Sequence, residues 1–276
     1  MTINCLGQLI DLSSPKVMGI LNVTPNSFYD GNRYNSENLI LKQVEKMLSE
    51  GATFIDLGAY SSKPNVELVS EEEEIARLIP VQQSVLKHFP DAILSIDTFR
   101  SNVAKICLDS GTAIINDISA GTLDENMFGV VAHFHAPYIM MHLRGTPQTM
   151  TTLTQYDDIV KEILYYFSEK IARARSFGIS DLIIDPGFGF AKTIDQNYEV
   201  LQKLELFQNL DYPILVGISR KSMVYKVLES TADAALNGTT VVNTIALTHG
   251  ANILRVHDVK EAVESVKLFE KMTARL

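Results

Sequence analysis

Residues 92–117 read AILSIDTFRSNVAKICLDSGTAIIND. A short apolar run, 92–96, ends in Asp97, an amphipathic stretch follows, and a second apolar run begins at 113. This order is typical of a strand, a helix and the next parallel strand in a sheet covered on both faces. The stretch therefore predicts a βαβ unit with a polar residue at the end of its first strand.

The same pattern recurs along the chain. Each unit is a short run rich in Ile, Val and Leu that ends in a polar residue and precedes an amphipathic stretch. The predicted strands are 17–21, 53–57, 92–96, 113–115, 137–141, 182–184, 214–218 and 252–256. Eight such units with no linker-like break predict an α/β fold, a single (β/α)8 TIM barrel domain over residues 1–276.

The main alternative is a doubly wound open sheet, which usually carries a glycine-rich turn after its first strand. The first predicted strand is followed by Asn22-Val23-Thr24-Pro25, which contains no glycine. This difference favours the barrel.

The predicted helices are marked by their ends. Ser70 and the three glutamates after it form a predicted capping box, with acidic side chains that complement the helix dipole. Ser36 is predicted to cap an earlier helix. Further helices are expected over 157–178 and 258–272, and Pro80 is expected to kink its helix rather than to end it.

Composition excludes several classes of protein. The chain has 276 residues, of which 46% are hydrophobic and 21% charged, which is typical of a globular protein. Its net charge of −9 gives no general electrostatic support for binding nucleic acid, although local cations can still hold an anionic substrate. Cys5 and Cys107 are too few for a disulfide framework, and the sequence shows neither a secretory leader nor a membrane span. We therefore expect a cytoplasmic protein.

Polar residues mark the ends of most of the predicted strands. Barrel enzymes carry their chemistry at the carboxyl ends of the strands and in the loops that follow. The residues at those positions are Asn22, Asp56, Asp97, Asn116, His142, Asp185, Ser219, Arg220, Lys221, Arg255 and His257. Packing of the barrel does not require so many polar groups on one rim, so we expect them to form an active site.

The basic residues of this rim suit a phosphate or a diphosphate. Arg255 and His257 are two residues apart in a strand, which places both on one side of it. With Lys221 and Lys63 they would form a cationic rim, in which Arg255 offers bidentate geometry. In the alternative interpretation, Arg255 pairs with a neighbouring carboxylate and His257 caps the last helix.

A second set of strand-end residues suits a flat ring with several nitrogens, such as a pterin. Asp97 and Asp185 can each accept paired N–H groups, and Asn116 can bind a neighbouring donor and acceptor. The apolar residues expected around them are Ile118, Met140 and Phe190. Alternatively, one of these carboxylates is already paired with Lys221 or Arg255.

Two other motifs point to different chemistry but carry less weight. His133 and His135 fall at the end of a predicted helix on the opposite rim, where their spacing sends them to different sides, so zinc binding is not expected. Lys221 could form a Schiff base, as in barrel aldolases, and this alternative can be tested by borohydride trapping with substrate.

Seven stretches, taken in order, resemble the dihydropteroate synthase family over nearly the whole chain. They are 18–25, 95–98, 115–118, 141–142, 185–190, 217–222 and 255–259. The resemblance implies a (β/α)8 barrel that joins 6-hydroxymethyl-7,8-dihydropterin diphosphate to 4-aminobenzoate. It also implies Mg²⁺-assisted, SN1-like C–O cleavage, sulfonamides as competitors and a homodimer formed through helices on the far side of the barrel.

The resemblance assigns roles to individual residues. The residues implied to hold the pterin are Asp97, Asn116, Asp185 and Lys221. Asn22 is implied to help bind Mg²⁺. Those implied to hold the diphosphate are Ser62, Arg255 and His257. Those implied to line the aminobenzoate site are Ser62, Pro64, Phe190, Lys221 and Ser222. We expect the residues nearest the chemistry to be Lys221, Asp97, Arg255 and His257.

Two loops depart from the family pattern. The first usually reads Thr-Pro-Asp-Ser-Phe, and this chain has Asn26 in place of the Asp. The second usually reads Gly-Gly-Glu-Ser-Thr-Arg-Pro-Gly, and this chain has Gly58-Ala59-Tyr60-Ser61-Ser62-Lys63-Pro64-Asn65. Lysine lacks the guanidinium fork of arginine, so closure of these loops is expected to differ.

This difference yields a first prediction. Restoring Asn26→Asp and Lys63→Arg should change the affinity for aminobenzoate and for sulfonamides, because both substitutions return charge or fork geometry to loops that close over the ligand. The KM for aminobenzoate and the inhibition constant of a sulfonamide measure this effect. If neither constant moves, the prediction is wrong.

Two other functions remain open from the sequence. A methyltetrahydrofolate:corrinoid methyltransferase would share the pterin-binding carboxylates but has no evident use for the basic stretches at 219–222 and 255–257. A non-catalytic pterin-binding paralogue is compatible with the altered loops, although the complete polar rim argues against it.

Overall fold

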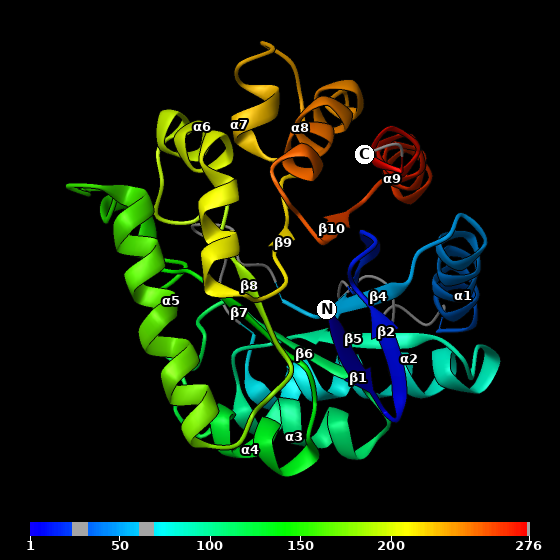
Figure 1. Ribbon diagram of the computed structural model, residues 1–276. Coiled ribbons are helices and arrows are strands. Elements are labelled where there is room, and N and C mark those ends of the chain that lie inside the picture. Colours follow the sequence, from blue (N-terminus) through cyan, green and yellow to red (C-terminus); the bar gives the residue numbers. More distant parts are fainter. Residues whose placement is uncertain (24–32, 61–68, 275–276) are drawn as a thin grey trace.

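Eight parallel strands form the barrel in the computed structural model, which describes residues 1–23, 33–60 and 69–274 (Figure 1). The strands are β3 (Lys16–Asn22), β4 (Phe54–Gly58), β5 (Ile93–Asp97), β6 (Ile114–Asp117), β7 (Tyr138–Met141), β8 (Leu182–Asp185), β9 (Leu215–Val216) and β10 (Ile253–Val256). Their order is β8-β7-β6-β5-β4-β3-β10-β9, and a parallel bridge between Ile184 and Ile214 joins the two ends. The predicted barrel is confirmed.

The helices surround the barrel on the outside (Figure 1). They are α1 (Arg33–Ser49), α2 (Glu71–His88), α3 (Ser101–Asp109), α4 (Met127–Phe134), α5 (Ile159–Ser176), α6 (Ile194–Gln202), α7 (Ser222–Tyr225), α8 (Leu236–Thr248) and α9 (Val259–Thr273). Among the described residues, Met150–Thr152 and Leu204–Leu210 form 3₁₀ turns. Among the helices of the described residues, none combines the length and the apolar character that crossing a bilayer demands.

Most helix ends agree with the sequence signals. Ser70 is the N-cap of α2, and its hydroxyl accepts a hydrogen bond from the Glu73 backbone N–H. This helix continues through Pro80 to His88, as predicted. The predicted start of α1 at Ser36 was wrong, because the helix begins three residues earlier, at Arg33.

An antiparallel hairpin at the N-terminus covers the amino ends of the barrel strands (Figure 1). It consists of β1 (Thr2–Cys5) and β2 (Gln8–Asp11). Ile3 and Ile10 of the hairpin pack against the first inward-facing residues of the barrel, among them Phe54. Both cysteines are free and buried. The hairpin therefore closes one end of the barrel with apolar side chains and leaves chemistry to the other end.

Candidate active site

The site begins with the two-residue repeat of the strands. In β5, Leu94 and Ile96 face the helices and belong to the large core, whereas Ile93 faces the barrel axis. The same alternation directs Asp97 inward at the end of the strand. Register then pairs Asp97 with Asn116 of β6, so polar side chains from neighbouring strands meet on one rim.

Arg255 is held by two carboxylates in the centre of this rim. Its Nε donates to Asp56 Oδ2 at 2.6 Å and its Nη2 donates to Asp97 Oδ2 at 2.7 Å. Asn116 Nδ2 also donates to Asp56 Oδ2, at 3.0 Å. Asp56 is fully buried, and the two negative charges raise the pKa of the Arg255 guanidinium despite its burial. The alternative in which Arg255 pairs with a carboxylate is therefore the arrangement in this structure.

Burial disfavours the charged form of the Asp97 carboxyl group. Loss of water raises the pKa of its carboxyl group, the nearby charge of Asp56 raises it further, and Arg255 opposes both effects. A carboxylate in such a setting gains strongly from any additional N–H donor, because the donor stabilises its charged form.

Asp185 and Lys221 form the second part of the site. Asp185 Oδ1 accepts a hydrogen bond from the Gly187 backbone N–H at 2.8 Å. Lys221 Nζ donates to the Phe188 carbonyl oxygen and lies 4.7 Å from the centre of the Phe190 ring. Burial lowers the pKa of Lys221 to about 8, and the charge of Asp185 limits this decrease.

The two parts lie close enough for their charges to interact. Burial raises the pKa of Asp185, and the charges of Lys221 and Arg255 both oppose this rise. The charge of Arg255 also contributes to the lowered pKa of Lys221. Asn22 lies exposed beside them: a side chain on Gly58 would have its Cβ 3.8 Å from both Asn22 Oδ1 and Asp97 Oδ2. The absence of that Cβ leaves space between the amide oxygen and the carboxylate.

An apolar wall borders the polar groups. The prediction that Met140 belongs to this wall was wrong. Ile118, Met141 and Phe190 pack together at the mouth of the barrel. Met140 instead belongs to the core between the strands and the helices. Adjacent residues of a strand point to opposite faces, so Met141 rather than Met140 faces the site.

His142 makes a buried contact with Lys192 that the sequence did not indicate. Its Nδ1 lies 3.1 Å from Lys192 Nζ, which also donates to the carbonyl oxygens of Gly187 and Phe190 at 2.9 and 3.1 Å. Burial lowers the pKa of Lys192 to about 7 and that of His142 well below its usual value. A neutral His142 can accept this hydrogen bond, and Lys192 thereby secures the loop beside Asp185.

His257 does not add a positive charge to the rim at neutral pH. The surrounding protein removes water from its imidazole and Arg255 repels a proton, so the pKa of His257 falls to about 4. Its backbone N–H donates to Ser219 Oγ at 3.2 Å. The residue before α9 is Asp258, so the interpretation of His257 as the cap of that helix was wrong.

Other predicted residues are placed as follows. Arg220 is bound to Asp258 through two hydrogen bonds of 2.9 and 2.8 Å, which keeps its guanidinium away from the site. Ser222 is the first residue of α7, directly after Lys221. The predicted residues Asn26, Ser62, Lys63 and Pro64 lie outside the described residues.

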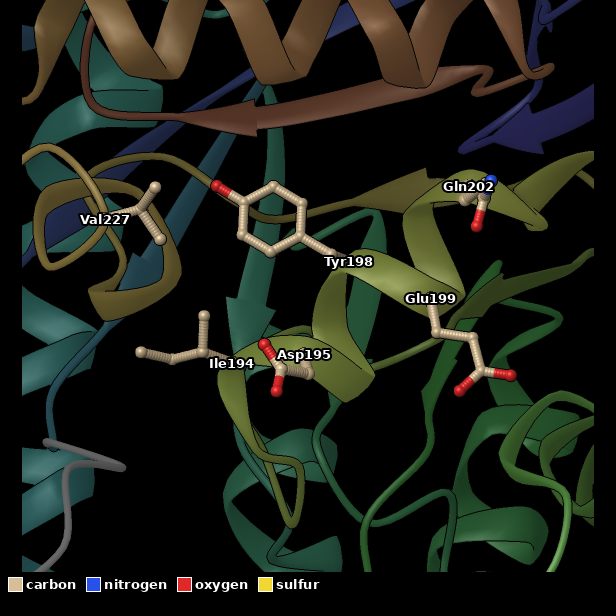
Figure 2. Close-up of a pocket in the computed structure, with 6 residues that line it drawn as sticks. All are labelled: Ile194, Asp195, Tyr198, Glu199, Gln202 and Val227. Atoms are coloured by element: carbon tan, nitrogen blue, oxygen red, sulfur yellow. The ribbon is translucent and has the colours of Figure 1, made fainter.

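A groove on the outer surface is separate from these groups. It lies between α6 and the turn after α7, with the ring of Tyr198 beside the turn that carries Val227 (Figure 2). The residues that line it are Ile194, Asp195, Tyr198, Glu199, Gln202 and Val227. None of them follows a barrel strand, so the groove is not part of the candidate active site.

Comparison with known proteins agrees with this architecture. Residues 18–257 match the profile of a family described as "Pterin binding enzyme". The dihydropteroate synthase of Escherichia coli strain K12 is 41% identical over 266 residues, which cover 96% of this chain and 94% of the relative.

Solved structures give the same result. A Yersinia pestis dihydropteroate synthase in complex with a sulfonamide drug has a TM-score of 0.92 and 39% identity, covering 99% of this chain and 100% of that one. A Xanthomonas albilineans dihydropteroate synthase with 4-aminobenzoic acid has a TM-score of 0.91 and 32% identity, covering 99% and 98%.

The profile, the relatives and the barrel together establish the class: a pterin-binding enzyme. Within that class, the chain belongs to the dihydropteroate synthases, which are transferases of folate biosynthesis. The relatives compared above are named as dihydropteroate synthases, which favours this function over the corrinoid methyltransferase and aldolase alternatives.

Proposed function

We propose that the pocket joins 6-hydroxymethyl-7,8-dihydropterin diphosphate to 4-aminobenzoate, releasing 7,8-dihydropteroate and diphosphate. The observation that carries the proposal is the position of Arg255, which bonds to Asp56 and Asp97 and whose charge also acts on Asp185. This arrangement places a cation for the diphosphate beside carboxylates for the heterocycle.

The carboxylates and Asn116 would bind the pterin ring. Asp185 is buried and Asp97 half-buried, and both can accept hydrogen bonds from ring N–H and amino groups. Loss of water raises the pKa of both carboxyl groups, so each such bond is strongly favourable. Lys221 has an ammonium group above the Phe190 ring, where it can donate to a ring nitrogen or a carbonyl oxygen of the pterin. The apolar wall would lie against the face of the ring.

The reaction needs a leaving group to be stabilised more than it needs a base. The C–O bond at the pterin methylene breaks, its electron pair departs with the diphosphate, and the electron-rich pterin stabilises the resulting cation. Arg255 would bind the departing oxygens, and neutral His257 would donate a hydrogen bond to them. The aminobenzoate nitrogen then attacks the methylene and releases a proton to solvent.

A magnesium ion fits the mouth of the site. Mg²⁺ is usually bound through one or two protein oxygens together with substrate phosphates and several waters. Asn22 supplies an amide oxygen that is exposed at the rim, next to the space over Gly58. When bound, Mg²⁺ would neutralise charge on the diphosphate.

One assay tests the proposed reaction directly. Purified protein, Mg²⁺, the pterin diphosphate and 4-aminobenzoate should yield dihydropteroate in an amount equal to the diphosphate released. A sulfonamide should compete with 4-aminobenzoate. Absence of product would contradict the proposal, and borohydride trapping of a substrate on Lys221 would favour the aldolase alternative.

A homodimer is the proposed assembly. Val227, Leu228 and Val241, near or on α7 and α8, are 53%, 53% and 52% exposed, and Ile245 lies one turn from Val241. Exposed apolar side chains that gather in one region are typical of protein interfaces. They adjoin the groove of Figure 2, which Val227 also lines.

This assembly gives a second prediction. The double variant Val241→Glu and Ile245→Glu should be monomeric, because it buries two carboxylates in the proposed interface. Analytical ultracentrifugation measures the change. Leu39→Glu is a matched control, since Leu39 is 66% exposed on α1 and should leave the dimer intact. A monomeric unmodified protein would contradict the proposed assembly.

We also infer that residues 1–276 act as one domain, because strands and helices from the whole barrel share one large core. A cytoplasmic location is proposed as well. The buried, unpaired thiols of Cys5 and Cys107 suit a reducing compartment.

A further inference from the structure

Tyr60 contacts the carboxylate at the centre of the site. It follows β4 by two residues, and its hydroxyl donates to Asp97 Oδ1 at 3.2 Å. The other oxygen, Oδ2, accepts from Arg255 at 2.7 Å. Asp97 is therefore held on both sides, by a neutral donor from one loop and by a cationic donor from β10.

The ring of Tyr60 also belongs to the apolar wall. It packs edge to face against Phe99, with 5.5 Å between the ring centres and an angle of 86° between the planes. Both rings contact the cluster that contains Ile118, Met141 and Phe190. Packing restricts the rotation of the ring, so the hydroxyl points to Asp97 without much freedom to turn away.

The chemistry of a phenol matters at this position. In the second-loop pattern Gly-Gly-Glu-Ser-Thr-Arg-Pro-Gly, the residue that aligns with Tyr60 is a glutamate, which in its ionised form cannot donate to Asp97. Burial and the charge of Asp97 raise the pKa of Tyr60 well above its usual value, so its hydroxyl keeps its proton at neutral pH. Tyr60 is therefore a neutral donor to Asp97.

We propose that Tyr60 is a positioning residue for substrate binding, whose hydroxyl holds the Asp97 carboxylate in the orientation that accepts N–H groups of the pterin. This inference rests on the proposed function, in which Asp97 binds the heterocycle. Tyr60 acts through Asp97 and takes no part in breaking the C–O bond.

Tyr60→Phe tests the proposal, because it removes the hydroxyl and keeps the ring. A hydrogen bond to a charged group is worth about 1.5–3 kcal/mol, which corresponds to about 10- to 100-fold in affinity. We expect the KM for the pterin diphosphate to rise by about tenfold, with a smaller change in kcat. The KM for 4-aminobenzoate should change less than that for the pterin.

The pH profile gives a readout that a purely structural role would not move. The titratable and charged groups that act on Asp97 or respond to its charge are Tyr60, Arg255, Asp56, Glu74 and Lys221. The hydroxyl of Tyr60 stabilises the charged form of Asp97 and so lowers its pKa. Its removal raises that pKa, so the acid limb of kcat/KM for the pterin should move to higher pH in Tyr60→Phe.

Tyr138→Phe is the matched control. Its hydroxyl also donates to a buried carboxylate, Asp117 Oδ2, at 2.6 Å, but this pair lies between β6, β7 and the helices. The control should lower thermal stability and leave the pterin KM and its pH profile unchanged. If Tyr60→Phe behaves in the same way as this control, the positioning role is refuted.

Direct binding separates this proposal from the proposed function. Calorimetry with 6-hydroxymethylpterin measures the affinity of both variants without turnover, and Tyr60→Phe should bind about tenfold more weakly than the unmodified chain. An unmodified chain that binds the pterin but makes no dihydropteroate would contradict the proposed reaction alone. Equal affinity of Tyr60→Phe and the unmodified chain would contradict the role of Tyr60 alone.

Discussion

Arg255→Ala is expected to lower kcat by about 10²–10³-fold, the loss seen when a main donor to developing negative charge is removed from an enzyme. Arg255 has five N–H donors, and those not bound to Asp56 and Asp97 can bind a departing diphosphate. The KM for 4-aminobenzoate should change much less, because Arg255 acts on the leaving group. Single-turnover measurement of diphosphate release checks the expected result.

The same substitution should also destabilise the fold in a pH-dependent way. Removing one partner of a buried ion pair costs about 3–5 kcal/mol, because the remaining charge is unpaired. Here Asp56, which is fully buried, and Asp97 both lose their partner. Burial raises the pKa of Asp97, so this carboxyl group becomes neutral as the pH falls, and the loss in melting temperature should be largest at neutral pH and smaller in acid.

Two controls accompany this variant. Arg255→Lys keeps the charge and loses the fork, so it should recover part of kcat. Arg173→Ala breaks an exposed pair with Glu125 on the outside of the barrel and should leave both kcat and stability nearly unchanged. A kcat of Arg255→Ala close to that of the unmodified chain would refute the role in diphosphate departure.

Asp185→Asn is expected to raise the KM for the pterin diphosphate by about a hundredfold. The amide keeps the size of the side chain but loses the negative charge and one acceptor oxygen, and charged hydrogen bonds are about twice as strong as neutral ones. The substitution also removes the charge that limits the decrease in the pKa of Lys221. The alkaline limb of the rate profile should therefore move to lower pH.

Asp117→Asn serves as its control. Asp117 is also a fully buried carboxylate at the end of a strand, but it accepts hydrogen bonds from Tyr138, Ser119 and Gly121. Its substitution should reduce stability without changing the pterin KM. Similar KM values for the Asp185 variant and this control would show that Asp185 does not bind the pterin.

The sequence predicted the rim of the barrel well because that rim follows from strand periodicity. Asp97, Asn116, Asp185 and Arg255 each lie at the end of a strand, and parallel strands of a barrel end on one side. The error at Met140 has a local cause. Successive residues of β7 point to opposite faces, with Ile139 and Met141 inward and Met140 towards the helices, so the prediction placed Met140 on the wrong face.

Partnerships across the barrel could not be predicted in this way. Arg255 bonds to Asp56 and Asp97, which lie 199 and 158 residues earlier in the chain. The choice among several carboxylates depends on the tilt and stagger of the strands, which one-dimensional periodicity does not contain. The lowered pKa of His257 has the same origin, because it depends first on how the folded chain removes water from the imidazole and then on how closely Arg255 approaches.

The N-terminal hairpin determines at which end of the barrel substrates can enter and products can leave. Ile3 and Ile10 seal the base of the cylinder, and the backbone of Asn4 is tied to Asp181 by a 2.9 Å hydrogen bond. In the part of the chain that the structure describes, the amino end of the barrel is covered, so we expect reactants and products to enter and leave at the opposite end. Release of the product diphosphate and binding of the next pterin diphosphate would then compete for the same end of the barrel.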